Sequence, residues 1–342
     1  YYELKEDYAH ALECYTSGGD HSKVSELLVR NAELHPGMGH YSEMEPYYRS
    51  LQESEIEASP SLMQSMSMLC SLSMDYEGAE KWYEALRAFA ACCGRGDAAG
   101  RQARSRLAWL DISLPQRSTA GMIDTFQAVF RLLLDKEVTL PPFSVTSALP
   151  SVMNGGKDFC EWSKTDIFLA NTLGPIAEKI LGKSGVGLVQ TALGESAYEK
   201  GEDRFRVLAY LTRGLNQSEN NGIAEMTWVA TALRSKLALC AGDMEYAQRL
   251  TSGMLQSLDP EHQPQLYEGV TAFSCWLSLY SNEIGRIRRW LETAPDETVE
   301  FCTLNRYFYM VKIYCYAALG KHTDALMLIS RMMAYADYAQ RT

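Results

Sequence analysis

The sequence predicts an all-α protein that folds as a right-handed superhelix of about eight helical hairpins. The first observation is the stretch 223–258, where two runs of helical periodicity flank a tight turn. The second is that this turn recurs along the chain about every 39 to 43 residues, the spacing of helical-repeat solenoids. We expect about 70% of the residues in helices and little or no strand, well above the usual share of helix.

The stretch 223–258 reads as two antiparallel helices joined at Gly242. This glycine can adopt the positive φ that ends a helix, and Asp243 can cap the next helix by accepting a backbone N–H. Apolar residues recur at steps of three and four, with Val229, Leu233, Leu237 and Cys240 before the turn and Ala247, Leu250, Met254 and Leu258 after it. One hairpin cannot bury such a face alone, so the pattern predicts packed neighbours.

Four further copies of the turn supply those neighbours. Each copy has one residue in the position of Gly242, and these are Gly19, Met74, Gly201 and Gly320. In the hairpin at 223–258, Ala247 stands five residues after Gly242 and allows the two helices to approach closely. Three of the copies have a small residue at the same spacing, namely Val24, Ala79 and Ala325. In the copy that starts at Gly201, we expect Ala209 to take this role three residues late. A weaker turn at Ser281–Asn282–Glu283 fits the same spacing.

The expected organisation follows from these turns. Residues 1–60 form an N-terminal helical hairpin and a polar linker, 52–60, that leads into the array. Residues 61–342 form the helical-repeat superhelix. An irregular insertion at about 135–160, rich in Pro and Gly, interrupts the array, and four further hairpins run from Val186 to Gln340.

The composition limits the possible functions. The net charge of −11 argues against direct nucleic-acid binding, which needs a basic surface. No apolar run is long enough to cross a membrane. Nine cysteines without disulfide or zinc spacing indicate a reduced, cytoplasmic protein. The chain starts at Tyr1 and reads as helix at both ends, so we expect it to be part of a longer protein.

The sequence contains no catalytic signature, and we expect neither catalysis nor a metal or cofactor in these residues. Gly182–Lys183–Ser184 resembles the end of a phosphate-binding loop, but Ala177 stands where that motif needs glycine, so a helix-ending turn is expected. No histidine pair has metal-ligand spacing, and no serine nucleophile elbow occurs.

Two arginine groups remain, Arg101 with Arg104 and Arg106, and Arg286 with Arg288 and Arg289. Each fits either a solvated helix face or a contact with an acidic partner.

Aromatic residues provide the only candidate binding site. They crowd the first helices of the last three hairpins, which line the concave wall when hairpins stack. Some must form the core between repeats, whereas others would stack on a sugar or an apolar ligand in a concave groove, with polar residues beside them. The candidate ligand-binding residues are Trp228, Arg234, Tyr267, Glu268, Trp276, Asn305, Arg306 and Tyr309.

The turn spacing, together with Leu193–Gly194 before Gly201, resembles the tetratricopeptide pattern, although the period is longer. The order of elements in the first 90 residues is similar to the helical region of MalT-like regulators of the LuxR class, which are large ATP-dependent transcription activators. It comprises a Gly–Asp hairpin (18–24), a short Tyr-rich helix (44–51), Ser59–Pro60, a helix (61–72) and the turn 75–79.

This resemblance implies a sensor and oligomerisation region that binds a small-molecule inducer or a regulatory protein and self-associates. The ATPase, with its ATP, and the DNA-binding domain would lie outside these residues. The alternative is a tetratricopeptide-like protein-interaction scaffold unrelated to transcription.

Overall fold

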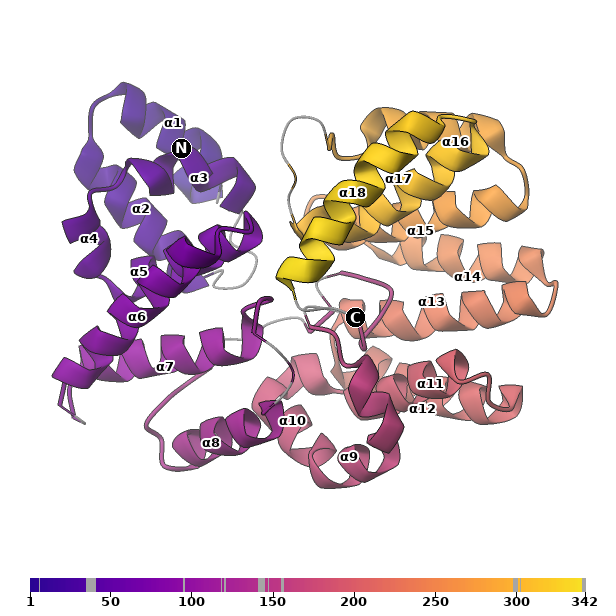
Figure 1. The fold of residues 1–342 in the computed structure, drawn as a ribbon, viewed down its shortest axis with the longest axis horizontal. Helices are drawn as coiled ribbons and strands as arrows, with labels where there is room; N and C mark the ends of the chain where they lie inside the picture. Colours follow the sequence, from indigo (N-terminus) through magenta and orange to yellow (C-terminus); the bar gives the residue numbers. More distant parts are fainter. Residues whose placement is uncertain are drawn as a thin grey trace. The chain divides into compact units, whose positions relative to one another are not determined.

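Over the residues that it describes, the computed structural model is all-helical, with 18 α-helices that make up most of a helix content of 77% (Figure 1). It describes residues 1–342 except 6, 35–40, 95, 118, 120, 141–144, 147, 155–156, 298–300, 302 and 340–342. Within those described residues there is no strand. The expected all-α class is therefore confirmed. The chain divides into two compact units, Tyr1–Pro141 and Pro142–Thr342, which we call unit 1 and unit 2.

Unit 1 contains α1 to α8. Their bounds are α1 Tyr8–Ser17, α2 His21–Leu34, α3 Tyr41–Ser50, α4 Glu53–Glu57, α5 Pro60–Leu72, α6 Tyr76–Cys92, α7 Ala98–Ser113 and α8 Met122–Leu134. Helix α5 is its centre, because all thirteen of its residues are buried and α2, α3, α6 and α7 all pack on it. Its Ser, Met and Leu residues are small or apolar on every side, which is typical of a fully enclosed helix. Residues 1–60 belong to the same compact unit as α5 to α8.

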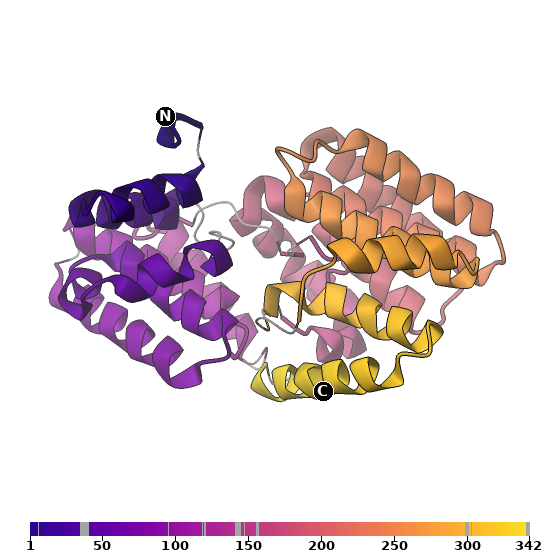
Figure 2. The same ribbon diagram turned by 90° about the horizontal axis from the view of Figure 1, so that it is seen from above.

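Unit 2 contains α9 to α18. Their bounds are α9 Asp166–Thr172, α10 Gly174–Leu181, α11 Leu188–Glu199, α12 Arg204–Asn221, α13 Ala224–Cys240, α14 Met244–Ser257, α15 Pro264–Tyr280, α16 Ile284–Thr293, α17 Arg306–Ala318 and α18 His322–Tyr338. The last eight form four consecutive helix pairs, as the sequence predicts. Figure 1 shows them one above another, and in Figure 2 the final pair, α17 and α18, lies side by side at the yellow end of the colour scale. The first helices also contact one another in order, α11 with α13, α13 with α15 and α15 with α17.

The predicted turns share one backbone conformation. Gly242 has a φ of 79°, and the N–H of Asp243 bonds to the carbonyl of Ala238 at 2.9 Å, which is the Schellman motif that ends helices. The Asp243 carboxylate then caps α14 by accepting the N–H of Tyr246. Positive φ occurs at every other expected turn position, namely Gly19, Met74, Gly201, Asn282 and Gly320. Met74 therefore adopts a conformation that normally favours glycine.

The small residue after each turn is buried, as expected, at Val24, Ala79, Ala247 and Ala325. The prediction for Ala209 is wrong, because this residue is exposed. Val207, which is 1% exposed, takes the position instead. The reason is a turn one residue longer than the others, in which Asp203, not Glu202, caps α12.

Two expected irregular regions differ in outcome. The linker 52–60 contains a short helix, α4, which the sequence interpretation missed. Its first turn is stabilised by the Glu55 carboxylate, which accepts the backbone N–H of Gln52 at 2.9 Å. In the expected insertion 135–160, the described residues contain no helix before the 3-10 turn that starts at Cys160.

Candidate functional site

The eight predicted ligand-binding residues lie on α13, α15 and the start of α17. Trp228 and Tyr309 are both 0% exposed. Trp228 packs edge-to-face on Phe273 at 5.1 Å between ring centres, and Tyr309 stacks on Phe301 at 4.8 Å. Trp228 therefore joins α13 to α15, Tyr309 joins α17 to the residues before it, and neither presents a free ring to solvent.

The remaining six have mixed surroundings. Arg234 is half-buried and donates to the Tyr246 hydroxyl of α14 at 3.0 Å. Arg306 is 8% exposed and donates to the carbonyl of Thr303. Glu268 is exposed, and the other three are half-buried, namely Tyr267, Trp276 and Asn305. The structure brings Trp228, Tyr267 and Trp276 together in one apolar cluster.

A segment of the insertion lies on the first helices of unit 2. Val152 is 7% exposed and belongs to the buried cluster formed by α11, α12 and α13, which includes Val229 and Leu233. Ala148 packs on the neighbouring cluster, which joins α13 to α15. We call residues 145–154 the inner segment, of which all but 147 are described. The surface beneath it, formed by α11, α13 and α15, is called the covered face.

Glu195 of α11 fastens the inner segment to the covered face. One carboxylate oxygen accepts the backbone N–H groups of Val152, at 2.7 Å, and Met153, at 3.1 Å. The other accepts the Ser151 hydroxyl at 2.5 Å. Glu195 is 3% exposed, so its carboxylate satisfies three donors that are largely shielded from water.

Burial sets the protonation behaviour of Glu195. Desolvation of the carboxylate raises its pKa above the ordinary value of 4.5. The three hydrogen bonds from the inner segment and the positive charge of Lys236 act in the opposite direction and offset part of this effect. A carboxyl group with a raised pKa fits a structural role here, because it can still accept hydrogen bonds when protonated.

A second close contact fixes the segment on α15. The carbonyl oxygen of Ala148 would lie 2.8 Å from a Cβ atom on Gly269, so only glycine leaves room for this approach. Ala148 itself has a φ of 61°, a left-handed conformation that disfavours alanine. Leu149 and Thr146 beside it are 6% and 1% exposed. The inner segment is therefore held tightly, in a backbone conformation that carries strain.

Sequence reasoning missed Glu195 and Gly269. Each had a weak local signal, since Glu195 stands in an otherwise small and apolar run and Gly269 interrupts a helix in which alanine would be more stable. Neither signal indicates which residue is contacted, because the contacts are distant in sequence. Glu195 contacts Val152, 43 residues earlier, and Gly269 contacts Ala148.

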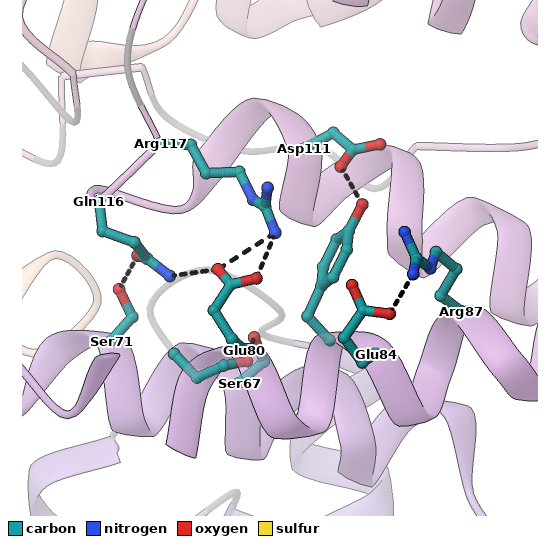
Figure 3. Close-up of polar contacts among 10 residues, drawn as sticks. Ser67, Ser71, Glu80, Glu84, Arg87, Asp111, Gln116 and Arg117 are labelled. Carbon is teal, nitrogen blue, oxygen red and sulfur yellow. Dashed lines mark hydrogen bonds and ion pairs between the residues drawn. The ribbon is translucent and has the colours of Figure 1, made fainter. Parts of the chain in front are cut away.

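Unit 1 has its own polar cluster, shown in Figure 3. Glu80 of α6 forms a salt bridge with Arg117 at 2.9 Å and accepts from Gln116, which in turn accepts from the buried Ser71 of α5. Tyr83 donates to Asp111 of α7 at 2.7 Å. The network links α5 and α6 to α7 and to the turn that follows α7. Its polar side chains form hydrogen bonds with one another. This arrangement indicates a structural role.

The predicted arginine group on α7 divides between two surroundings. Arg106 is buried and donates to the carbonyl of Ala32 at 3.0 Å and to Gln64 at 2.8 Å, so it does not belong to a solvated face. Arg101 is exposed, and both arginines line a hollow of about 340 Å³. The other residues of this hollow include Gln102, Ser105 and Thr139.

Comparisons with protein-family models, curated proteins and solved structures gave no match to this chain. Over the residues that the structure describes, no group of three or more His, Cys, Asp or Glu side chains is placed to hold a metal ion. In the same part of the chain, every helix is too short or too polar to cross a membrane.

Proposed function

We propose that this chain is a helical-repeat binding module whose first helices form the recognition surface. In this proposal the hairpins build a right-handed, tetratricopeptide-like superhelix. The observation that carries it is the succession of contacts from α11 to α13, α15 and α17, which extends one surface across four helix pairs. Repeat proteins use such surfaces to bind partners.

The biological role that fits best is the sensor and self-association region of a MalT-like regulator of the LuxR class. The support is the order of α1, α2, α3 and α5, which follows the order that suggested this family, although α4 stands between α3 and α5. The net charge of −11 favours a role apart from DNA contact. In this role the region has no catalysis of its own and works in the cytoplasm, with ATP bound elsewhere in the protein.

A thermal-shift screen tests the binding role. The chain is melted with sugars, amino acids, aromatic acids and nucleotides, and a ligand at about 100 times its Kd adds about 2.7 kcal/mol of stability. A shift that Tyr267→Ala and Arg234→Ala both abolish supports an inducer site on α13 and α15. Both variants change side chains that are only half-buried, whereas Trp228→Ala would open a cavity in the core.

The coding sequence on either side tests the regulator role. A phosphate-binding ATPase motif before the chain and a LuxR helix-turn-helix after it support the assignment. If neither is present, the regulator role is wrong and the binding module remains.

The second candidate is a scaffold for protein partners that is unrelated to transcription. The observation that favours it is that an irregular peptide segment, residues 145–154, already lies on the first helices. Self-association or capture of a protein partner without any small-molecule shift would support this candidate.

A further inference from the structure

We propose that the covered face is a peptide-binding surface, and that the inner segment occupies it in place of an uncharged peptide from a partner protein that binds in the same bent conformation. This inference rests on the proposed function only for the role of the first helices as a recognition surface. It adds the class of partner, a peptide, and the residues that would bind it, Glu195 and Gly269.

The covered face recognises backbone groups. Glu195 accepts two successive N–H groups, those of Val152 and Met153, and every non-proline peptide offers such a pair. Gly269 admits a peptide carbonyl to a distance that any side chain would block. Glu195 on α11 and Gly269 on α15 would therefore contact the backbone of a bound peptide at two points. These contacts do not depend on the side chains of the peptide.

Side chains of the inner segment define the preferred partner. Val152 is 7% exposed and packs on α11 and α13, so the surface around Glu195 accommodates an aliphatic group, and Leu149 nearby in the segment is also buried. Ser151 donates to Glu195 and accepts the N–H of Asn154 at 2.9 Å, which turns the chain after the two bound amides. Residues 145–154 carry no charge, in a protein with a net charge of −11. A partner peptide would therefore be neutral, with a serine or threonine before aliphatic residues.

The inner segment is suited to being displaced. Ala148 is held at a positive φ, which stores strain that is released when the segment leaves. Glu195 accepts three hydrogen bonds from the segment, so one carboxylate provides a large part of its anchoring. Because segment and surface belong to one chain, the segment competes at an effective concentration in the millimolar range. A free peptide would therefore bind the native protein weakly. It would bind more strongly to a variant in which the inner segment no longer holds its place on the covered face.

The test uses a fluorescent synthetic peptide with the sequence of residues 145–154 and the whole chain. Val152→Pro removes a donated N–H from the segment and leaves the covered face unchanged. We expect this variant to bind the peptide at least about tenfold more tightly than the native chain, by fluorescence polarisation. Adding Glu195→Ala to Val152→Pro should remove the gain. Adding Glu199→Ala, an exposed carboxylate on the same helix, should leave it intact.

A native-protein measurement covers the case in which Val152→Pro does not fold. Hydrogen exchange should show the Val152 and Met153 amides opening at least about tenfold faster than those of Val229 and Leu233, because local opening needs less free energy than global unfolding. Equal rates would mean that the segment is a permanent part of the core and would overturn the inference. So would a folded Val152→Pro variant that binds the peptide no better than the native chain.

These outcomes separate the inference from the proposed function. A small-molecule shift without peptide binding would overturn the peptide-binding inference and keep the sensor role. Peptide binding in a protein without ATPase and helix-turn-helix neighbours would support the inference and overturn the regulator role.

Discussion

The carbonyl oxygen of Ala148 lies so close to Gly269 that a Cβ atom there would be 2.8 Å away, a distance that real Cβ contacts essentially never show. The contact places the irregular segment 145–154 directly against the middle of α15. A single methyl group added at Gly269 therefore tests where this segment lies.

Gly269→Ala should destabilise unit 2, although alanine is the better helix former. The forced contact with Ala148 costs about 1–3 kcal/mol, against a gain of about 1 kcal/mol in helix propensity. We expect a net loss of about 1 kcal/mol by urea unfolding. The matched control is Gly253→Ala in α14, where nothing lies within 4 Å and the residue is exposed. If both substitutions stabilise the protein equally, the segment does not lie on α15.

Gly242→Ala tests the turns that define the repeats. A Cβ atom on Gly242 would have no neighbour within 4 Å, so the φ of 79° is the only obstacle to alanine. We expect a loss of about 1–2 kcal/mol from left-handed strain. The reverse change, Met74→Gly, should gain about 0.5 kcal/mol, since relief of strain exceeds the added entropy of the unfolded chain. Thermal unfolding measures both, and changes of the same sign would contradict the shared turn geometry.

The turns could be predicted from the sequence because they are local. Gly242 and Asp243 each act on atoms within five residues, through a positive φ and a capped N–H. The same spacing identified Met74, whose conformation follows from its place in the pattern. The prediction failed at Ala209, where one added residue moved the buried position to Val207. Local spacing alone does not reveal such a shift.

The candidate site was less accessible to sequence reasoning. Aromatic residues such as Trp228 and Tyr309 serve equally well in a core or on a binding surface, and the structure buries both. The sequence predicts an irregular insertion at about 135–160, but the position of its residues 145–154 depends on contacts with Glu195 and Gly269, which are distant in sequence. Contacts of this kind arise from packing, and the periodicity of a single helix does not encode them.

Glu195→Gln should change how stability depends on pH. Burial raises the Glu195 pKa above 4.5, so the folded state binds this proton more tightly than the unfolded state. The contribution of Glu195 to stability is therefore present below pH 4.5 and is lost as the pH rises through the raised pKa. Glutamine is nearly isosteric, and its carbonyl oxygen can accept both backbone N–H groups. We expect the variant to gain stability relative to the native chain as the pH rises from about 4 to about 7.

Urea unfolding at several pH values measures this difference, and parallel curves for the two proteins would contradict the buried placement of Glu195. Glu195→Ala is the companion variant, because it leaves the Val152 and Met153 amides without their acceptor. It should lose about 1–3 kcal/mol, with the larger loss at low pH, where the protonated Glu195 contributes most.

The pair formed by Glu297 and Lys312 should show the opposite pH dependence. Their side chains are 12% and 5% exposed, and the Lys312 ammonium also donates to the carbonyl of Pro295 at 2.8 Å. Burial alone would raise the Glu297 pKa, but hydrogen bonds from Lys312 and Tyr316 outweigh it and hold the pKa below 4.5. The stabilisation from Glu297 is therefore present above pH 4.5 and is lost as the pH falls through the lowered pKa.

Lys312→Met should lower the free energy of unfolding by about 3–5 kcal/mol at pH 7, because it leaves a buried carboxylate without its cation. The double variant Lys312→Met with Glu297→Gln should recover most of this loss, since no charge then remains buried. Urea unfolding of the native chain, both single variants and the double variant gives the coupling energy. Purely additive losses would mean that the side chains of Lys312 and Glu297 do not interact.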